Sequence, residues 1–141
     1  MILDVRNRQR SHPVNVARLR QLAGNAAADF QSLSIVLVSD TEMARLNLRY
    51  HAVAGTTDVL SFDYGAGHGE LIISVARAVA QARQYRTTPS QELALYVIHG
   101  ILHLQGYDDL TPGKRRQMRA AERRLLRRLD FRGLLPVRCE A

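Results

Sequence analysis

The sequence predicts an α+β fold: a small mixed four-stranded sheet packed with about five helices. Short β-branched runs alternate with longer segments of helical periodicity, in the order β-α-β-α-β-β-α-α-α. The 141 residues suffice for one domain with a buried core, and no repeat, low-complexity tract or linker divides them. A hydrophobic share of 46% and a charged share of 23% are typical of globular proteins. We therefore expect residues 1–141 to form a single domain.

The first half of the chain predicts two strand–helix units. Apolar residues within 2–5 indicate a short first strand. Pro13 is expected at the start of a helix that ends near Gly24-Asn25 or continues through the alanines that follow. The β-branched run over residues 33–38 is typical of a central strand. The Ser-x-x-Glu capping box at the start of 39–50 indicates a second helix.

The second half predicts a strand pair and three helices. Residues 59–62 and 71–73 are expected to be strands, separated by a flexible loop that the glycines mark: Gly65, Gly67 and Gly69. A helix over 75–82 follows. The next helix begins at Thr88-Pro89 and stops at Gly106; because it is apolar on most of its circumference, we expect it to be the central buried helix. Thr111-Pro112 opens a last, arginine-rich helix.

The predicted buried helix carries the chemistry. His99 and His103 are four residues apart, so both imidazoles lie on one helix face and can converge on one ion. Gly106 then lets the backbone turn, and Asp109 is expected to close the metal site as a third ligand, preferred over Asp108 on spacing. The structural alternative is a pair of core histidines bonded to backbone carbonyls.

Three protein ligands with a position open for water describe a catalytic metal site. A divalent metal there would make the chain a metal-dependent hydrolase. Zinc proteases with two histidines at this spacing have a glutamate directly after the first histidine, and this chain has Gly100. The missing glutamate argues against ordinary peptide hydrolysis. Glu92 is expected either to orient a ligand or to stabilise the helix start.

The segment from His99 to Asp109 resembles the signature HGxLHLxGYDH of the YbeY family of bacterial endoribonucleases. The stretches Leu46–Tyr50 and Thr57–Phe62 are similar as well, and the resemblance covers roughly residues 40–130. It implies a compact α+β domain with the metal, most often Zn²⁺, in a cleft beside the sheet. It also implies a cytoplasmic, single-strand-specific endoribonuclease that acts in small-subunit rRNA maturation and ribosome quality control, with RNA and the ribosome small subunit as partners.

Two departures from the family pattern concern the site. Asp109 stands where the family has its third histidine; aspartate is a competent zinc ligand that favours somewhat harder ions. His51 stands where the family has an arginine that points into the cleft, and Arg49 lies two residues earlier. We expect either Arg49 or His51 to take the catalytic role of that arginine, or the role to be weakened.

The charge pattern agrees with an RNA partner without requiring one. The formal net charge is +7, and most of the cations are arginine, which pairs with phosphate through two parallel hydrogen bonds. The alternative is arginine codon usage in a GC-rich genome. No signal peptide and no membrane-length apolar run is visible, so a cytoplasmic location is expected. The competing functions are an RNA- or ribosome-binding protein with a structural metal, and a metallohydrolase of another substrate.

Overall fold

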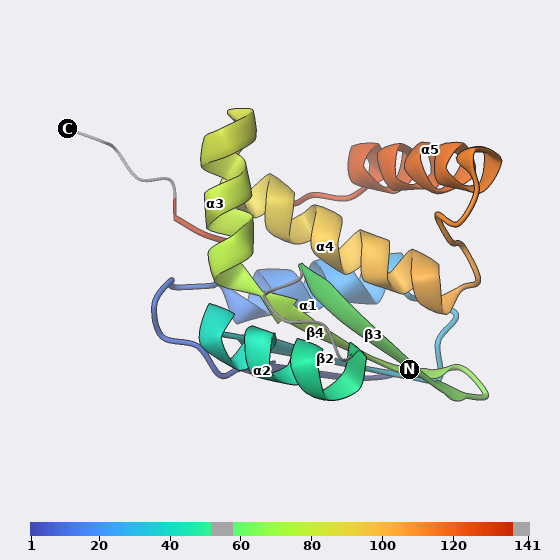
Figure 1. The fold of residues 1–141 in the computed structure, drawn as a ribbon, viewed down its shortest axis with the longest axis horizontal. Helices are drawn as coiled ribbons and strands as arrows, with labels where there is room; N and C mark the ends of the chain where they lie inside the picture. The colour runs from blue at the N-terminus through green and yellow to red at the C-terminus, as the bar shows by residue number, and fades with distance from the viewer. Residues whose placement is uncertain (52–57, 137–141) are drawn as a thin grey trace.

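The computed structural model describes residues 1–51 and 58–136, and of His51 only the backbone. The elements follow the predicted order and confirm the α+β class (Figure 1). They are β1 (Ile2–Asn7), α1 (Val16–Ala26), β2 (Ser32–Val38), α2 (Asp40–His51), β3 (Val59–Gly65), β4 (His68–Ser74), α3 (Val75–Tyr85), α4 (Pro89–Leu104) and α5 (Pro112–Arg128).

The sheet is mixed, as predicted. Its strand order is β1-β2-β4-β3, with β1 and β4 both parallel to β2 and with β3 antiparallel to β4. The β-branched strand β2 is therefore internal, as its apolar run predicts. Strand β3 forms one edge of the sheet.

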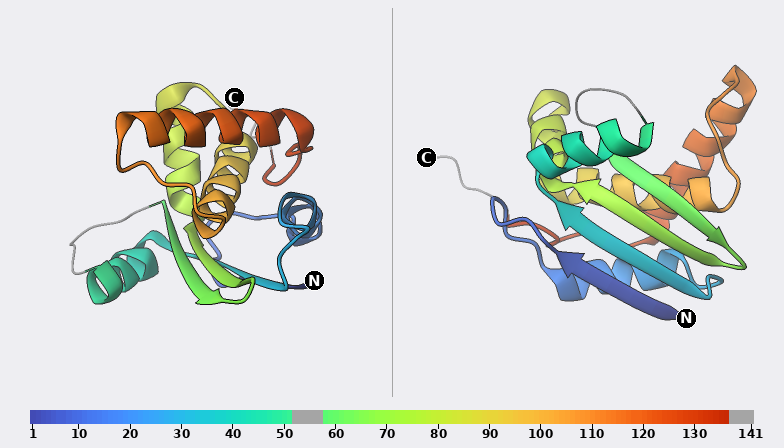
Figure 2. Two further views of the ribbon diagram at one scale, coloured as in Figure 1. Left: turned by 90° about the vertical axis from the view of Figure 1, so that its right-hand side faces the viewer. Right: turned by 60° about the horizontal axis from the view of Figure 1, so that its bottom comes forward.

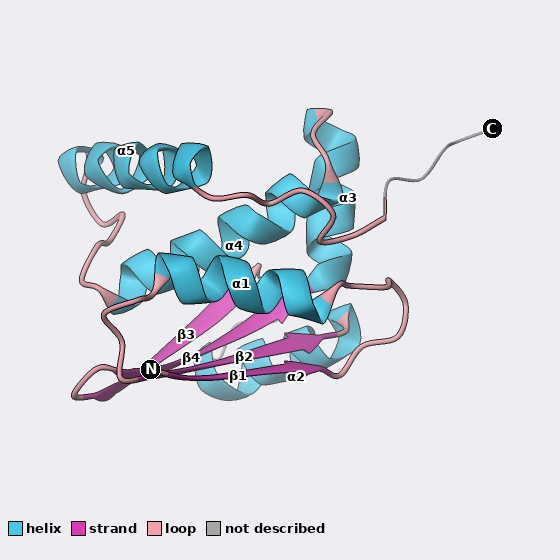
Figure 3. Cartoon of the chain, turned by 180° about the vertical axis from the view of Figure 1, so that it is seen from behind, coloured by secondary structure: helices cyan, strands magenta, loops and turns pink. Residues whose placement is uncertain are grey.

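The two faces of the sheet have different covers. Leu33, Ile35 and Leu37 of β2 belong to the main core, which α1 and α4 complete on one face (Figure 3). Val36 and Val38 point to the other face, where they meet Met43 of α2 in a smaller apolar cluster. Figure 2 shows that α2 lies over one end of the strands on this second face, and it is the one described helix there.

The predicted helix starts are confirmed at α4 and α5. The Thr88 hydroxyl accepts a hydrogen bond from the Gln91 N–H at 3.1 Å, and the Thr111 hydroxyl accepts one from Lys114 at 3.2 Å. At α2 half of the expected capping box forms: Ser39 Oγ accepts from the Glu42 N–H at 3.1 Å. The Glu42 carboxylate pairs instead with the guanidinium of Arg8 at 3.4 Å. That pairing ties the end of β1 to α2.

Two local predictions are wrong. The helix expected at Pro13 begins at Val16, because the Asn15 side chain caps it by accepting from the Arg18 N–H at 3.1 Å. The flexible loop expected over the glycines is a tight hairpin turn. Positive φ angles of 53° at Ala66 and 79° at Gly67 match a type I′ turn, whose twist suits two adjacent antiparallel strands.

Helix α4 lies against β4 at Gly100. A Cβ atom at this position would come within 2.6 Å of Leu71 Cδ2, and Leu71 is fully buried. The residue after His99 therefore faces the sheet, where a glutamate side chain has no room. The close packing of α4 on Leu71 therefore explains why no glutamate follows His99.

We predict that Gly100→Ala lowers the free energy of unfolding by about 1–3 kcal/mol, because the added methyl group overpacks the contact with Leu71. The loss is expected although alanine favours helix over glycine by about 1 kcal/mol. Urea unfolding measures it. Gly113→Ala is the matched control, since its Cβ would meet nothing closer than 3.9 Å. A Gly100→Ala protein as stable as the Gly113→Ala protein would contradict the prediction.

Candidate active site

The two histidines of α4 lie side by side. Their Nε2 atoms are 3.0 Å apart and their rings meet edge to face, with centroids separated by 4.5 Å. This proximity follows from the four-residue spacing on a helix. Both rings are partly buried. The predicted convergence of His99 and His103 is thus present in the structure.

A carboxylate from the last helix holds one of the rings. Glu122 Oε1 of α5 lies 2.8 Å from His99 Nδ1, and both side chains are mostly buried, with exposed fractions of 20% and 33%. The tautomers that satisfy both contacts are Nδ1–H for His99 and Nε2–H for His103. Glu122 therefore turns the Nε2 lone pair of His99 toward His103.

Sequence analysis did not assign this role to Glu122. A signal for it exists, since Glu122 is the only acid between Lys114 and Arg128 and directly follows the buried Ala121 on α5. An isolated carboxylate on the inward side of a cationic helix indicates a buried partner. One of the two roles expected for Glu92 was to orient a histidine ligand, but the carboxylate that contacts His99 is that of Glu122. Its side chain is buried, and burial raises the pKa of its carboxyl.

The loop after α4 separates the two aspartates. Asp108 accepts hydrogen bonds from the Leu110 N–H at 3.0 Å and from Lys114 Nζ at 3.4 Å. These two groups, with His103 nearby, hold the pKa of Asp108 below its usual value. Asp109 is exposed, and its backbone carbonyl accepts from Arg115 at 3.2 Å. Within residues 1–51 and 58–136, no hydrogen bond or ion pair engages the Asp109 carboxylate.

A cavity of about 260 Å³ opens beside His99. Its walls come from α4, α5 and the start of β3, and its lining residues are Asp58, Val59, Leu95, Tyr96, His99 and Glu122. Tyr96 is buried, and in the described part of the chain its hydroxyl oxygen has no hydrogen-bond partner. Burial, and then the charges of Asp58 and Glu92, raise the pKa of Tyr96, so its hydroxyl stays protonated. The phenol of Tyr96 therefore adds no negative charge to the cavity wall beside the imidazole.

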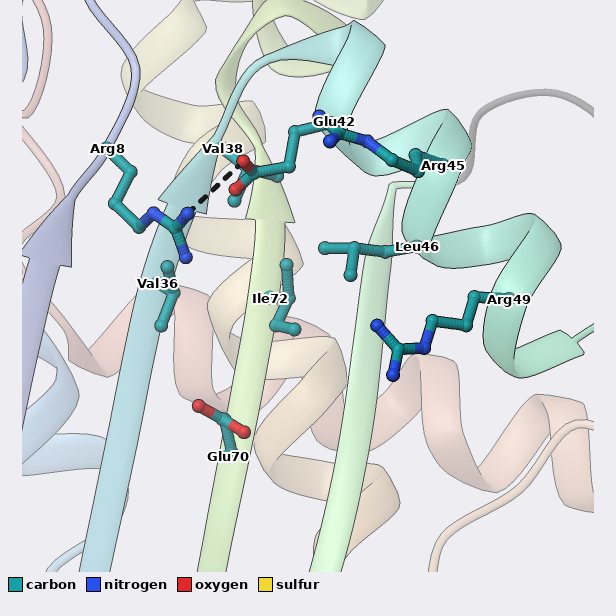
Figure 4. A pocket seen from close by; sticks show the side chains of 9 residues that line it. All are labelled: Arg8, Val36, Val38, Glu42, Arg45, Leu46, Arg49, Glu70 and Ile72. Atoms are coloured by element: carbon teal, nitrogen blue, oxygen red, sulfur yellow. Dashed lines mark hydrogen bonds and ion pairs between the residues drawn. The ribbon is translucent and has the colours of Figure 1, made fainter.

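Neither predicted catalytic residue, Arg49 or His51, is placed beside the histidine pair. Arg49 lines a different cavity, on the face of the sheet that α2 covers (Figure 4). That cavity shares no lining residue with the one beside His99. His51 is the last residue of α2, and its side chain lies outside the described structure.

The donor set fits a metal ion at the histidine pair. Two imidazole nitrogens bound to one tetrahedral zinc ion lie about 3.3–3.4 Å apart, close to the 3.0 Å between the two Nε2 atoms. A carboxylate on the other nitrogen of a ligating histidine is the usual support of such a ligand. In the described ranges, no group of three His, Cys, Asp or Glu side chains is assembled. The third ligand therefore stays a prediction.

Comparison with known proteins identifies the family. The family model described as endoribonuclease YbeY matches residues 4–130. A curated endoribonuclease YbeY from Thermodesulfovibrio yellowstonii is 39% identical over 108 residues, which cover 71% of this chain and 68% of the relative.

The chain belongs to the endoribonuclease YbeY family. The YbeY relative from Geobacter metallireducens is 31% identical, and the match covers 96% of this chain and all of the relative. The solution structure of TM1509 from Thermotoga maritima has the same fold, with a TM-score of 0.61 and 24% identity over 89% of this chain and 87% of that one. None of the helices described for this YbeY chain combines the length and hydropathy of a membrane span.

We predict that His99 is protonated on Nδ1, because that nitrogen donates to Glu122. Nitrogen-15 NMR of the imidazoles, with chelator and at a pH where they are neutral, reads the tautomer directly. Glu122→Ala is expected to move His99 toward the Nε2–H tautomer. Glu70→Ala is the control, since this carboxylate bonds to Tyr64 on the other face of the sheet. An unchanged His99 spectrum in Glu122→Ala would contradict the assignment.

Proposed function

We propose that this YbeY-family endoribonuclease cleaves single-stranded RNA with one divalent metal ion, Zn²⁺ by preference, held by His99, His103 and Asp109. The observation that carries the proposal is the pair of Nε2 atoms 3.0 Å apart, with the other nitrogen of His99 bound to Glu122. When bound, such an ion polarises a phosphoryl group and makes water a better nucleophile at neutral pH.

The residues of the chain have distinct tasks in this proposal. Glu122 keeps the His99 ring oriented and raises its basicity as a ligand. Asp109 has a carboxylate that none of the described contacts engages, whereas Asp108 is committed to Leu110 and Lys114. This difference supports Asp109 as the third ligand. Tyr96 adds an uncharged hydroxyl to the cavity wall, since burial keeps that hydroxyl protonated.

The surroundings of the site suit a polyanion. Helix α5 supplies Glu122 to the site and turns its arginines to solvent, all of them exposed: Arg115, Arg116, Arg119, Arg123, Arg124, Arg127 and Arg128. Exposed arginines beside the cavity would neutralise phosphates and make RNA binding fall with salt. Peptide hydrolysis is disfavoured because Gly100, in the position of the protease glutamate, is packed on the sheet.

The wider role is proposed from family membership. We propose that the chain acts as one domain in the cytoplasm, matures small-subunit rRNA, and contacts the small ribosomal subunit in ribosome quality control. Arg49 and His51 are proposed as phosphate-binding or catalytic side chains. Because Arg49 lines a second cavity, we propose that it contacts a phosphate in a more distant part of the RNA.

We predict that His103→Ala lowers metal content from near one equivalent to a small fraction and lowers cleavage of single-stranded RNA by at least about 100-fold. The reason is the loss of one of two paired imidazole donors. Elemental analysis and a gel assay on the same preparation measure both. His68→Ala is the control, since this exposed imidazole contacts Ser32 on the sheet. Full metal content with no cleavage in the unmodified protein would contradict the ribonuclease proposal and favour RNA binding alone.

We predict that Asp109→Ala loses much more metal than Asp108→Ala, by about tenfold or more in the dissociation constant. Asp108 is engaged by the loop, and its removal costs hydrogen bonds within the loop rather than a ligand. Competition with a chromophoric chelator measures the affinities. Equal losses, or a loss confined to Asp108→Ala, would exclude Asp109 as the third ligand.

A further inference from the structure

A second cavity lies between α2 and the sheet, on the face opposite to the main core. Its volume is about 310 Å³, within the range of small-ligand sites. Figure 4 shows its layout: the strands form the floor, α2 forms one wall, and charged side chains stand around the rim. The lining residues are Arg8, Val36, Val38, Glu42, Arg45, Leu46, Arg49, Glu70 and Ile72.

Three guanidinium groups surround an apolar floor. Val36 and Ile72 lie on the floor, and the guanidiniums of Arg8 and Arg49 stand on opposite sides of it (Figure 4). Arg45 and Arg49 are exposed and, in the described part of the chain, neither has an ion-pair partner. Among the described residues, the Arg8 side chain has one ion-pair contact, at 3.4 Å with Glu42. Uncommitted guanidiniums around a concave surface suit phosphate, which they bind through paired hydrogen bonds.

The cavity also offers acceptors. Glu42 Oε1 is buried, and within the described residues it has no hydrogen-bond partner. A buried acceptor without a donor is costly, and because this oxygen is closed to solvent, a ligand N–H or O–H reaches it only if the Glu42 side chain turns toward the cavity. Glu70 stands at the opposite end and accepts from the Tyr64 hydroxyl at 2.8 Å. Phosphate alone would not use these carboxylates, whereas an amino group of a base or a ribose hydroxyl would.

Aromatic rings continue the same face of the sheet. Phe62 pairs with Glu70 across the strands, and its ring meets that of Tyr50 edge to face at 5.3 Å. Tyr50 and Tyr64 are 53% and 66% exposed. Arg49 also lies over the Tyr50 ring, 5.5 Å from its centroid. Exposed aromatic rings beside arginines without an ion-pair partner are typical of surfaces that bind single-stranded nucleic acid.

We propose that this cavity binds one nucleotide of a single-stranded RNA, with the phosphate on Arg45 and Arg49 and the base over the floor of Val36 and Ile72. The inference rests on the proposed function, since it takes the same substrate class. It adds a contact on the other face of the sheet from His99. The RNA would pass around the edge strand β3, which supplies Val59 to the site beside His99 and pairs with β4, a strand of the second cavity's floor.

The chemistry favours RNA over an acidic peptide. An acidic peptide would satisfy the arginines, but its flexible Asp and Glu side chains present no flat apolar face to the floor. A nucleotide supplies an anion, a flat apolar face and hydrogen-bond donors together. Arg8, Arg45 and Arg49 outnumber Glu42 and Glu70, so the rim keeps a net positive charge.

The test is equilibrium binding of a fluorescent single-stranded oligoribonucleotide, followed by anisotropy across a salt series. Binding is measured in the His103→Ala background with chelator, so that cleavage does not interfere. Arg45→Gln/Arg49→Gln is compared with Arg83→Gln/Arg86→Gln, which removes the same charge from exposed positions at the end of α3. Arg45→Lys/Arg49→Lys keeps the charge and tests the paired geometry.

We expect Arg45→Gln/Arg49→Gln to weaken binding about tenfold and to reduce the slope of log affinity against log salt by roughly 0.7, the value for one phosphate contact on a single strand. The α3 control should change affinity less than about twofold, and the lysine pair should lie between the two. If both glutamine pairs weakened binding equally, net charge alone would explain the loss of affinity, and the proposal would be overturned. Displacement of the RNA by polyglutamate or inorganic polyphosphate as effectively as by unlabelled RNA would also overturn it.

The outcomes separate this inference from the proposed function. Cleavage that depends on His103, together with unchanged binding in Arg45→Gln/Arg49→Gln, would retain the function and overturn the second site. Weakened binding in that variant, in a protein that never cleaves RNA, would support the second site and overturn the function.

Discussion

The contact between Gly100 of α4 and Leu71 of β4 fixes how α4 lies on the sheet, and with it the position of His99. Because Gly100 has no side chain, the Leu71 side chain packs directly on the backbone of α4, and the helix lies close on the sheet with its apolar residues in the main core. The helix can then neither rotate nor lift without opening the core. His99, the neighbour of Gly100, is thereby directed away from the sheet and toward α5, where Glu122 meets it. The packing and the chemistry of this helix depend on the same residue.

Helix α5 combines two opposite electrostatic tasks. Its inward side presents the carboxylate of Glu122 to His99, and its outward side presents arginines to solvent. Like charges along one helix repel, so this arrangement costs helix stability. Burial of Met118 and Ala121 against the core offsets that cost. The result is a wall of the cavity that is anionic where it supports an imidazole and cationic where it meets solvent.

The two faces of the sheet carry cavities with different lining side chains. On the α4 face, the cavity beside His99 has titratable side chains and one neutral phenol, a combination suited to chemistry. On the α2 face, the second cavity has guanidiniums over an apolar floor, a combination suited to holding a strand in place. Helix α2 covers only part of that face, which leaves the aromatics of β3 and α2 exposed beside it. A single-stranded substrate is flexible enough to contact both faces around one edge strand.

Local sequence signals were sufficient for the fold class and for half of the site. The apolar run of β2, the threonine caps of α4 and α5, and the four-residue spacing of His99 and His103 act over a few residues, so they can be read along the chain. The geometry of the turn between β3 and β4 could not be predicted from the sequence in the same way. Ala66 adopts a positive φ only because the two flanking strands pair directly, and no propensity of alanine indicates that conformation.

Tertiary structure decided the partners. Glu122 is 23 residues from His99, and no spacing rule connects them; the packing of α5 on α4 does. The same holds for Arg8 and Glu42, which are 34 residues apart, and for the placement of Arg49 in a cavity of its own. The sequence by itself determined that two imidazoles share one face of a buried helix, because side-chain types and helical spacing are local. Only the fold decided which carboxylate supports which imidazole and which face of the sheet receives each arginine, because those contacts depend on how distant segments pack.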